Sequence, residues 1–241
     1  MASWNANKRD KLELPRLTAA AIADPHGFGG LELKLWNLHV PRRFYHLFYK
    51  MPPGAVCIDC GANVGKFTDA VLHQGGSSYA FEPNTVLFNF LSRKYAGNRR
   101  VQLFKAALGA SDGTAKFYLP ADTHDNPGAT YEDGSLWQRQ RREQAQSYDT
   151  VQVMDFARFL KQEFGAGSQA AQPPIWLIKM DIEGSEFEVV ERLITEQVYR
   201  LARHIVVETH EKFFSDQEDR LQRLRHIISE AGADNIELGW V

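Results

Sequence analysis

The stretch "VCIDCGANVG", residues 56–65, joins an apolar run to a turn that contains two glycines four residues apart. The apolar run predicts a buried strand, and the spacing of the apolar residues that follow Gly65 predicts a helix. Glycine lets the backbone of such a turn come close to a ligand, and the first N–H groups of the helix can bind polar groups. The stretch therefore predicts a strand–turn–helix unit that binds a ligand.

Short apolar runs alternate with helical patterns along the rest of the chain. Most of the runs lack alternating polar residues, which is typical of strands that helices cover on both faces. This order predicts an α/β fold with a mainly parallel, doubly wound sheet. The predicted strands are residues 55–59, 77–81, 101–105, 175–180, 204–208 and 235–241.

Two segments depart from this alternation. Residues 1–53 are partly helical and aromatic, and we expect them to form an N-terminal cap on an α/β core that spans residues 54–241. Residues 115–119 and 149–153 predict an inserted antiparallel pair, joined by a long polar loop at about 120–147 that we expect to act as a lid. The whole chain, 1–241, is interpreted as a single domain.

Composition excludes several classes of protein. The net charge of −2 indicates no overall attraction to nucleic acid or to an anionic membrane. No apolar run suits a signal peptide or a membrane-spanning helix, so we expect a cytoplasmic location and no membrane partner. Cys57 and Cys60 are the only cysteines, and in a strand their side chains point to opposite faces, which argues against a redox or metal pair.

Acidic residues near the glycine turn indicate the kind of ligand. Glu82 follows the second predicted strand, where a carboxylate can accept hydrogen bonds from both ribose hydroxyls. Asn63 replaces the middle glycine of a dinucleotide-binding turn, and Asp59 at the mouth of the turn would repel a pyrophosphate. A nucleoside with a cationic portion, S-adenosylmethionine, fits better than NAD. In the alternative structural interpretation, Asp59 caps the helix and Glu82 merely ends a strand.

Three motifs together resemble the FkbM family of S-adenosylmethionine-dependent methyltransferases: "VCIDCGANVGKFT" (56–68), "YAFEPN" (79–84) and "IKMDIEGSEFEVV" (178–190). The resemblance covers about residues 54–212. It implies a Rossmann-like class I methyltransferase fold and O-methylation of a small acceptor such as a sugar, a glycoside or a secondary metabolite. It also implies that the cofactor is held by Asp59, Gly61, Asn63, Gly65 and Glu82.

One departure from this fold is the absence of a recognisable seventh strand. The sheet edge is expected to be shortened, or to be completed by the N-terminal region or by a second subunit of a homo-oligomer. Two rival functions remain open at this point. They are an NAD-dependent oxidoreductase and a module that binds S-adenosylmethionine without catalysis.

Methyl transfer to a hydroxyl requires removal of its proton. The favoured candidates for this step are Asp181, which ends a predicted strand, and then Glu208 and His210, which follow the next one. These three residues could instead hold Mg²⁺, an interpretation we do not favour, so no metal site is predicted. A third interpretation has Asp181 and Glu183 bind the first N–H groups of a helix. That helix is expected to begin with a capping box formed by Ser185 and Glu188.

Overall fold

The computed structural model describes residues 16, 18–118, 148–165, 173–210 and 216–240. A six-stranded sheet with the order β3-β2-β1-β7-β8-β9 forms its centre, and every neighbouring pair is parallel. The predicted α/β class is confirmed. The strands are β1 (Val56–Cys60), β2 (Ser77–Phe81), β3 (Val101–Phe104), β7 (Ile175–Met180), β8 (Ala202–Val207) and β9 (Ile236–Leu238).

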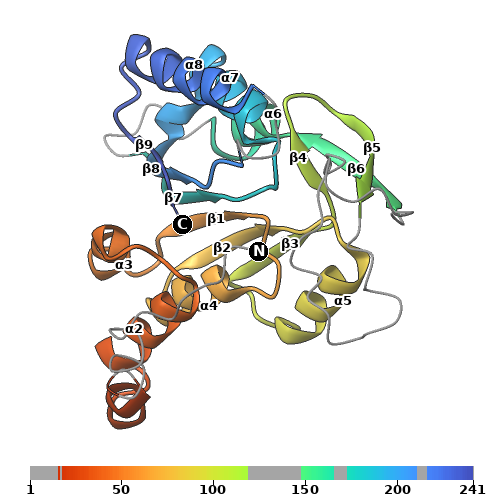
Figure 1. Ribbon diagram of the computed structural model, residues 1–241. Helices are drawn as coiled ribbons and strands as arrows, with labels where there is room; N and C mark the ends of the chain where they lie inside the picture. The colour runs from red at the N-terminus through yellow and green to blue at the C-terminus, as the bar shows by residue number, and fades with distance from the viewer. Residues whose placement is uncertain (1–15, 17, 119–147, 166–172, 211–215, 241) are drawn as a thin grey trace.

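Helices cover both faces of this sheet. Figure 1 shows α6, α7 and α8 on one side, with α2, α4 and α5 on the other. None of the helices in the described ranges is long and apolar enough to cross a membrane. The helices beside the sheet are α4 (Lys66–His73), α5 (Thr85–Lys94), α6 (Phe156–Phe164), α7 (Glu186–Thr195) and α8 (Gln217–Glu230), and a short 3-10 helix, η5 (Val198–Leu201), precedes β8.

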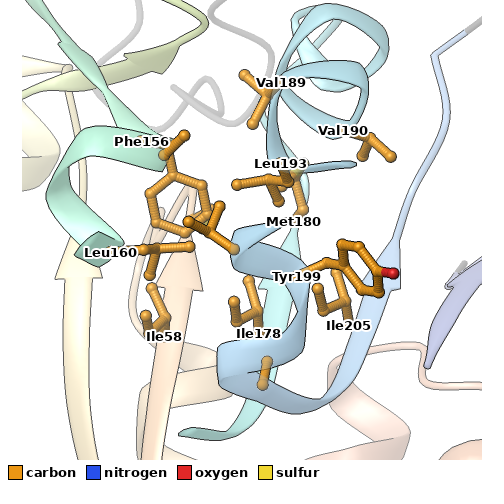
Figure 2. Close-up of a cluster of buried hydrophobic side chains, with 14 of the residues drawn as sticks. Ile58, Phe156, Leu160, Ile178, Met180, Val189, Val190, Leu193, Tyr199 and Ile205 are labelled. Carbon is orange, nitrogen blue, oxygen red and sulfur yellow. The ribbon is translucent and has the colours of Figure 1, made fainter. Parts of the chain in front are cut away.

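The alternation of side chains along the strands explains the continuous apolar runs. Cys57, Leu177 and Val206 enter the core on the side of α4. Ile58 and Ile178 enter the opposite core, where Figure 2 shows them beneath side chains of α6 and α7. Both faces are therefore apolar.

The two cysteines follow the same alternation. Cys57 lies in the core beside α4, whereas Cys60 lies in the core beside α6 and α7. Both are buried and free, and burial raises the pKa of each thiol well above its usual range. The prediction that they are strand residues is confirmed.

The N-terminal segment packs into the core beside α4. It contains α2 (Phe28–Asn37), η1 (Arg42–Phe44) and α3 (Tyr45–Tyr49). Trp240, which is fully buried near the C-terminus, has its ring centroid 5.3 Å from that of Phe44 and 6.3 Å from that of Phe67. The cap and the end of the chain thus share one hydrophobic core with the sheet.

A second, three-stranded sheet follows β3. In it β5 (Gly113–Tyr118) and β6 (Tyr148–Asp155) pair antiparallel, as predicted, while β4 (Ala107–Gly109) pairs parallel with β6. β4 was not predicted because three residues are too few to show a periodic pattern. The predicted lid at 120–147 lies outside the described residues.

Within the described ranges the main sheet has six strands and ends at β9, so its edge is shortened, whereas completion by a second subunit stays a prediction. β9 lies directly beside β8 and is parallel to it. The resulting strand order is the one that dinucleotide-binding folds use. The strand order alone therefore does not distinguish a methyltransferase from a nicotinamide-dependent enzyme.

The predicted capping box at the start of α7 is wrong. The Ser185 side chain makes no capping hydrogen bond. Instead the Glu186 carboxylate accepts the N–H groups of Ile182 and Gly184, at 2.9 and 2.8 Å. This happens because Glu183 and Gly184 adopt positive φ angles of 58° and 117°, which turn the backbone toward the first residue of the helix.

Asn84 caps the start of α5. Its Oδ1 accepts the N–H groups of Val86 and Leu87 at 2.8 and 3.2 Å. We expect Asn84→Ala to lower the free energy of unfolding by about 1 kcal/mol, since the cap satisfies N–H groups that the helix leaves unpaired. Urea unfolding of Asn84→Ala and of Asn84→Asp would test this, because aspartate keeps the acceptor; equal losses in both variants would contradict it.

Candidate active site

The carboxyl ends of β2, β1, β7 and β8 meet at one edge of the sheet. β1 leads into the glycine turn, β2 into Glu82, β7 into Asp181 and β8 into Glu208. The strand order reverses between β1 and β7, and open parallel sheets bind ligands at such a point. The predicted site residues therefore lie at one edge, although they are far apart in sequence.

The glycine turn is shaped by packing as well as by access for a ligand. Gly61 has φ +83°, and a Cβ atom there would lie 1.9 Å from the carbonyl oxygen of Asp181. Gly65 has φ +80°, and its Cβ would lie 2.3 Å from the hydroxyl oxygen of Tyr95. Both positions therefore require glycine so that the turn can pack against the loop after β7 and against α5.

Glu82 is buried and lies beside the turn. One carboxylate oxygen accepts the Asn63 N–H at 2.8 Å, and the other accepts the Asn84 N–H at 2.9 Å. Burial raises the pKa of Glu82 to about 7, although these two hydrogen bonds oppose the effect. Each oxygen keeps a lone pair that a ligand hydroxyl could use.

Asp59 lies deeper than a residue at the mouth of the turn would. It is fully buried, and its Oδ2 accepts a hydrogen bond from the Thr68 hydroxyl at 2.8 Å. Its Oδ1 lies 3.6 Å from Nζ of Lys179. Burial raises the pKa of Asp59, while the Lys179 ammonium and the Thr68 hydroxyl act in the opposite direction. The contact with Thr68 ties Asp59 to α4, so a structural role accompanies any role in binding.

Lys179 links the glycine turn to Asp181. Its ammonium donates to the carbonyl oxygen of Gly61 at 2.8 Å and lies 3.1 Å from Oδ2 of Asp181. Burial alone lowers the pKa of Lys179, but the carboxylates of Asp181 and Asp59 outweigh burial and raise it. Lys179 is thus a buried cation that draws the ends of β1 and β7 together.

His210 is a buried histidine behind the same edge of the sheet. Its Nδ1 lies 2.8 Å from Oε1 of Glu186. Its Nε2 lies 3.8 Å from a carboxylate oxygen of Asp181, 3.5 Å from Glu183 and 3.7 Å from Glu208. The structure thus brings the three predicted catalytic residues together, with His210 the most deeply buried of them.

The surrounding carboxylates favour protonated His210. Burial alone lowers the pKa of its imidazole, but the hydrogen bond to Glu186 and the charges of Glu186, Glu183 and Asp181 raise it to about 9. Within the described ranges, Asp181, Glu183 and His210 place three possible metal-ligand atoms within 4.8 Å of one another. In the structure these residues form an ion cluster, in which the imidazole of His210 supplies positive charge between carboxylate oxygens of Asp181 and Glu183 at 3.8 and 3.5 Å.

This raised pKa predicts a pH-dependent stability. Below about 6.5 the imidazole is protonated whether the chain is folded or unfolded; as the pH rises to about 9, its stabilising charge is lost. We expect this contribution, on the order of 3 kcal/mol, to disappear over that range. Urea unfolding at pH 6 and pH 9.5 would show a smaller pH dependence in His210→Gln than in the wild type.

His226→Gln is the matched control, because the side chain of His226 is 70% exposed on α8. Its unfolding should follow the wild-type pH dependence. If His210→Gln and His226→Gln behave alike, His210 does not carry the raised pKa.

Two cavities open at the edge of the sheet and share Gly61, Asn63 and Asp181. The first lies beside Glu82 and is walled mainly by apolar side chains. These are Phe81, Pro83, Leu87, Ala106, Ala107, Leu108, Phe117 and Ile182.

The second cavity is polar and lies on the other side of the turn. Asp59, Lys66, Lys179 and Glu208 contribute charged groups to its wall. The remainder comes from Asn37, Leu38, His39, Ala62, Val64 and Phe67. The N-terminal cap therefore supplies part of this wall.

Two residues of the second cavity, Asp59 and Asn63, each have one buried side-chain oxygen without a hydrogen bond. Oδ1 of Asp59 and Oδ1 of Asn63 accept no hydrogen bond from the described residues. Oδ1 of Asp59 faces the Lys179 ammonium at 3.6 Å without a hydrogen bond. Buried acceptors usually have a hydrogen bond, so two that lack one at residues of a cavity suit a ligand that brings donors. An ammonium group or a hydroxyl is such a donor.

Two features of this edge were not predicted from the sequence. The capping-box pattern indicates Ser185 and Glu188, and the signal for Glu186 is its place two residues after Gly184. His39 is exposed and lines the second cavity with φ +57°, an uncommon backbone conformation for histidine. No local pattern indicated that the cap turns toward the site.

Comparison with known proteins agrees with this arrangement. The family model described as the methyltransferase FkbM domain matches residues 59–234. The chain is also 27% identical over 178 residues to methyltransferase sdnD of Sordaria araneosa, covering 67% of this chain and 68% of that protein. The family match spans well over half of the chain, from the glycine turn to the residues before β9. The protein is therefore a methyltransferase of the FkbM family.

Proposed function

We propose that the protein transfers a methyl group from S-adenosylmethionine to a hydroxyl of a small acceptor, such as a sugar, a glycoside or a secondary metabolite. The observation that carries the proposal is the pair of cavities that meet at Gly61, Asn63 and Asp181. One is apolar with a carboxylate at its side, and the other is polar, with two residues that each have a buried oxygen without a hydrogen bond in the described part of the chain. S-adenosylmethionine likewise has two parts, an adenosine that suits the apolar cavity and an amino-acid portion that suits the polar one.

The apolar cavity suits the adenosine half. Aromatic and aliphatic walls such as Phe81, Leu87 and Phe117 favour a flat, weakly polar base. Glu82, which is held by two backbone N–H groups, would accept the ribose hydroxyls. Its carboxylate is already oriented, so little conformational freedom is lost on binding.

The polar cavity suits the amino-acid half and the acceptor. Oδ1 of Asp59 and Oδ1 of Asn63 would accept hydrogen bonds from the ammonium group, and their burial keeps water from competing. Gly61 lines both cavities and would give the ligand access to the backbone of the turn, whereas Gly65 lines neither and would support the turn by packing against Tyr95. Together with Glu82, these four residues are the ones that the resemblance to the family indicated.

When bound, S-adenosylmethionine supplies the methyl group and leaves as S-adenosylhomocysteine. The task of the protein is to orient the acceptor hydroxyl and to take its proton as the new bond forms. Asp181 lies at the junction of both cavities, and 28% of its side chain is exposed, so it can meet an acceptor. Glu208 lines the same wall and would orient the acceptor.

Binding measurements test the proposal without knowledge of the acceptor. Calorimetric titration should give micromolar affinity for S-adenosylmethionine and S-adenosylhomocysteine, and none for NAD. Glu82→Gln should weaken the first two by roughly tenfold to a hundredfold, since a hydrogen bond to a charged group is worth about 1.5–3 kcal/mol. Glu237→Gln, on an exposed residue of β9, should change nothing. Binding of NAD alone would overturn the proposal in favour of an oxidoreductase.

A further inference from the structure

One buried carboxylate behind the candidate site receives three N–H donors. Glu186, the first residue of α7, has no exposed surface. Its Oε1 accepts the Ile182 N–H at 2.9 Å and lies 2.8 Å from Nδ1 of His210, while Oε2 accepts the Gly184 N–H at 2.8 Å. An ionised carboxylate only accepts hydrogen bonds, so His210 must present Nδ1–H to it.

The first consequence concerns the turn that carries Asp181. Glu183 and Gly184 both have positive φ, and such a conformation at Glu183 is strained and persists only where the surrounding structure holds it. Hydrogen bonds to a charged acceptor can offset this strain. Glu186 therefore fixes the path of the backbone directly after Asp181.

The second consequence concerns the other nitrogen of the imidazole. With Nδ1–H held by Glu186, Nε2 is directed toward Asp181, Glu183 and Glu208, at 3.8, 3.5 and 3.7 Å. On its other oxygen, Asp181 faces the ammonium of Lys179 at 3.1 Å. The candidate base thus lies between two buried cations, and Glu186 orients one of them.

We propose that Glu186 is a positioning residue of the active site, which holds His210 as an imidazolium beside Asp181 and Glu208. The role given to His210 changes accordingly. It is a cation that orients the carboxylates, and Asp181 takes the acceptor proton. The inference that Glu186 serves catalysis rests on the proposed function. The charge of His210 and its dependence on Glu186 can be measured on the protein alone.

The charge of His210 is the readout that a purely structural role of Glu186 would not move. Its pKa of about 9 corresponds to about nine-tenths imidazolium at pH 8. In Glu186→Gln the amide offers one acceptor oxygen and no charge, so we expect that fraction to fall well below one half. ¹⁵N NMR of the histidine side chains in the full-length protein measures it, with His210→Gln identifying the signal.

Matched variants separate the outcomes. Glu191→Gln, on the same helix but paired with the exposed Arg223, should leave His210 protonated. If His210 in the wild type titrates near 6.5, the proposal is overturned, and this test needs no variant to fold. It is also overturned if Glu186→Gln folds and His210 keeps its charge. Calorimetric binding of S-adenosylmethionine to the same samples reports on the proposed function separately.

Discussion

Asp181→Asn is expected to lower the rate of methyl transfer by about 10²- to 10⁴-fold, which is the range for loss of a general base. The amide has the same size as the carboxylate, but it cannot take a proton from the acceptor hydroxyl. Asp181 also lies 3.1 Å from Nζ of Lys179, so the variant removes one of that cation's two charged partners. Asp59 remains beside Lys179 at 3.6 Å, and we therefore expect the chain to fold.

The measurement is a single-turnover assay with labelled S-adenosylmethionine and an acceptor found by screening hydroxylated metabolites. Affinity for S-adenosylmethionine should stay within about threefold of the wild type, because a catalytic base contributes to the rate and little to binding of the cofactor. Asp234→Asn, an exposed residue before β9, is the control and should be fully active.

Glu208→Gln tests whether Asp181 or Glu208 is the general base. A modest loss of rate in this variant, with a large loss in Asp181→Asn, supports Asp181 as the base. The reverse result would assign that role to Glu208. Equal activity of Asp181→Asn and the wild type would contradict the assignment, and a protein that binds S-adenosylmethionine but methylates nothing in either form would favour a module without catalysis.

Gly61→Ala is expected to lower the free energy of unfolding by more than about 3 kcal/mol, a large part of the stability of most domains. The new Cβ would lie 1.9 Å from the carbonyl oxygen of Asp181, so the turn after β1 and the loop after β7 would have to separate. That movement would break the 2.8 Å hydrogen bond from Lys179 to Gly61 and open both cavities. Binding of S-adenosylmethionine should be lost with it.

Gly54→Ala is a matched control for backbone strain. Gly54 has φ +79°, close to that of Gly61, but a Cβ there would meet nothing within 4 Å. It should therefore cost only about 1–2 kcal/mol, the price of a left-handed conformation for alanine. Urea unfolding followed by circular dichroism compares the two variants. Equal destabilisation would show that the close approach to Asp181 is not what requires glycine at position 61.

The strands at the centre of the sheet could be predicted well because their residues are mainly apolar and lack the regular polar alternation of a half-exposed strand. The limits predicted for residues 77–81 and 175–180 agree with β2 and β7. Predictions of which side chain binds the free N–H groups of a turn were less successful, because several neighbouring side chains can form the same hydrogen bonds. Ser185 had the right spacing for a capping box, but Glu186 binds the N–H groups of that turn instead.

The sequence by itself determined the α/β class, the doubly wound parallel sheet, the family, and the residues at the strand ends. These follow from local periodicity and from motifs in which neighbouring residues act together. Only the tertiary structure decided that Asp59 is buried against Thr68, that Glu186 binds His210, and that the cap reaches the second cavity. The physical reason is that burial and charge pairing depend on residues far apart in the chain, and folding alone brings those residues within a few ångströms.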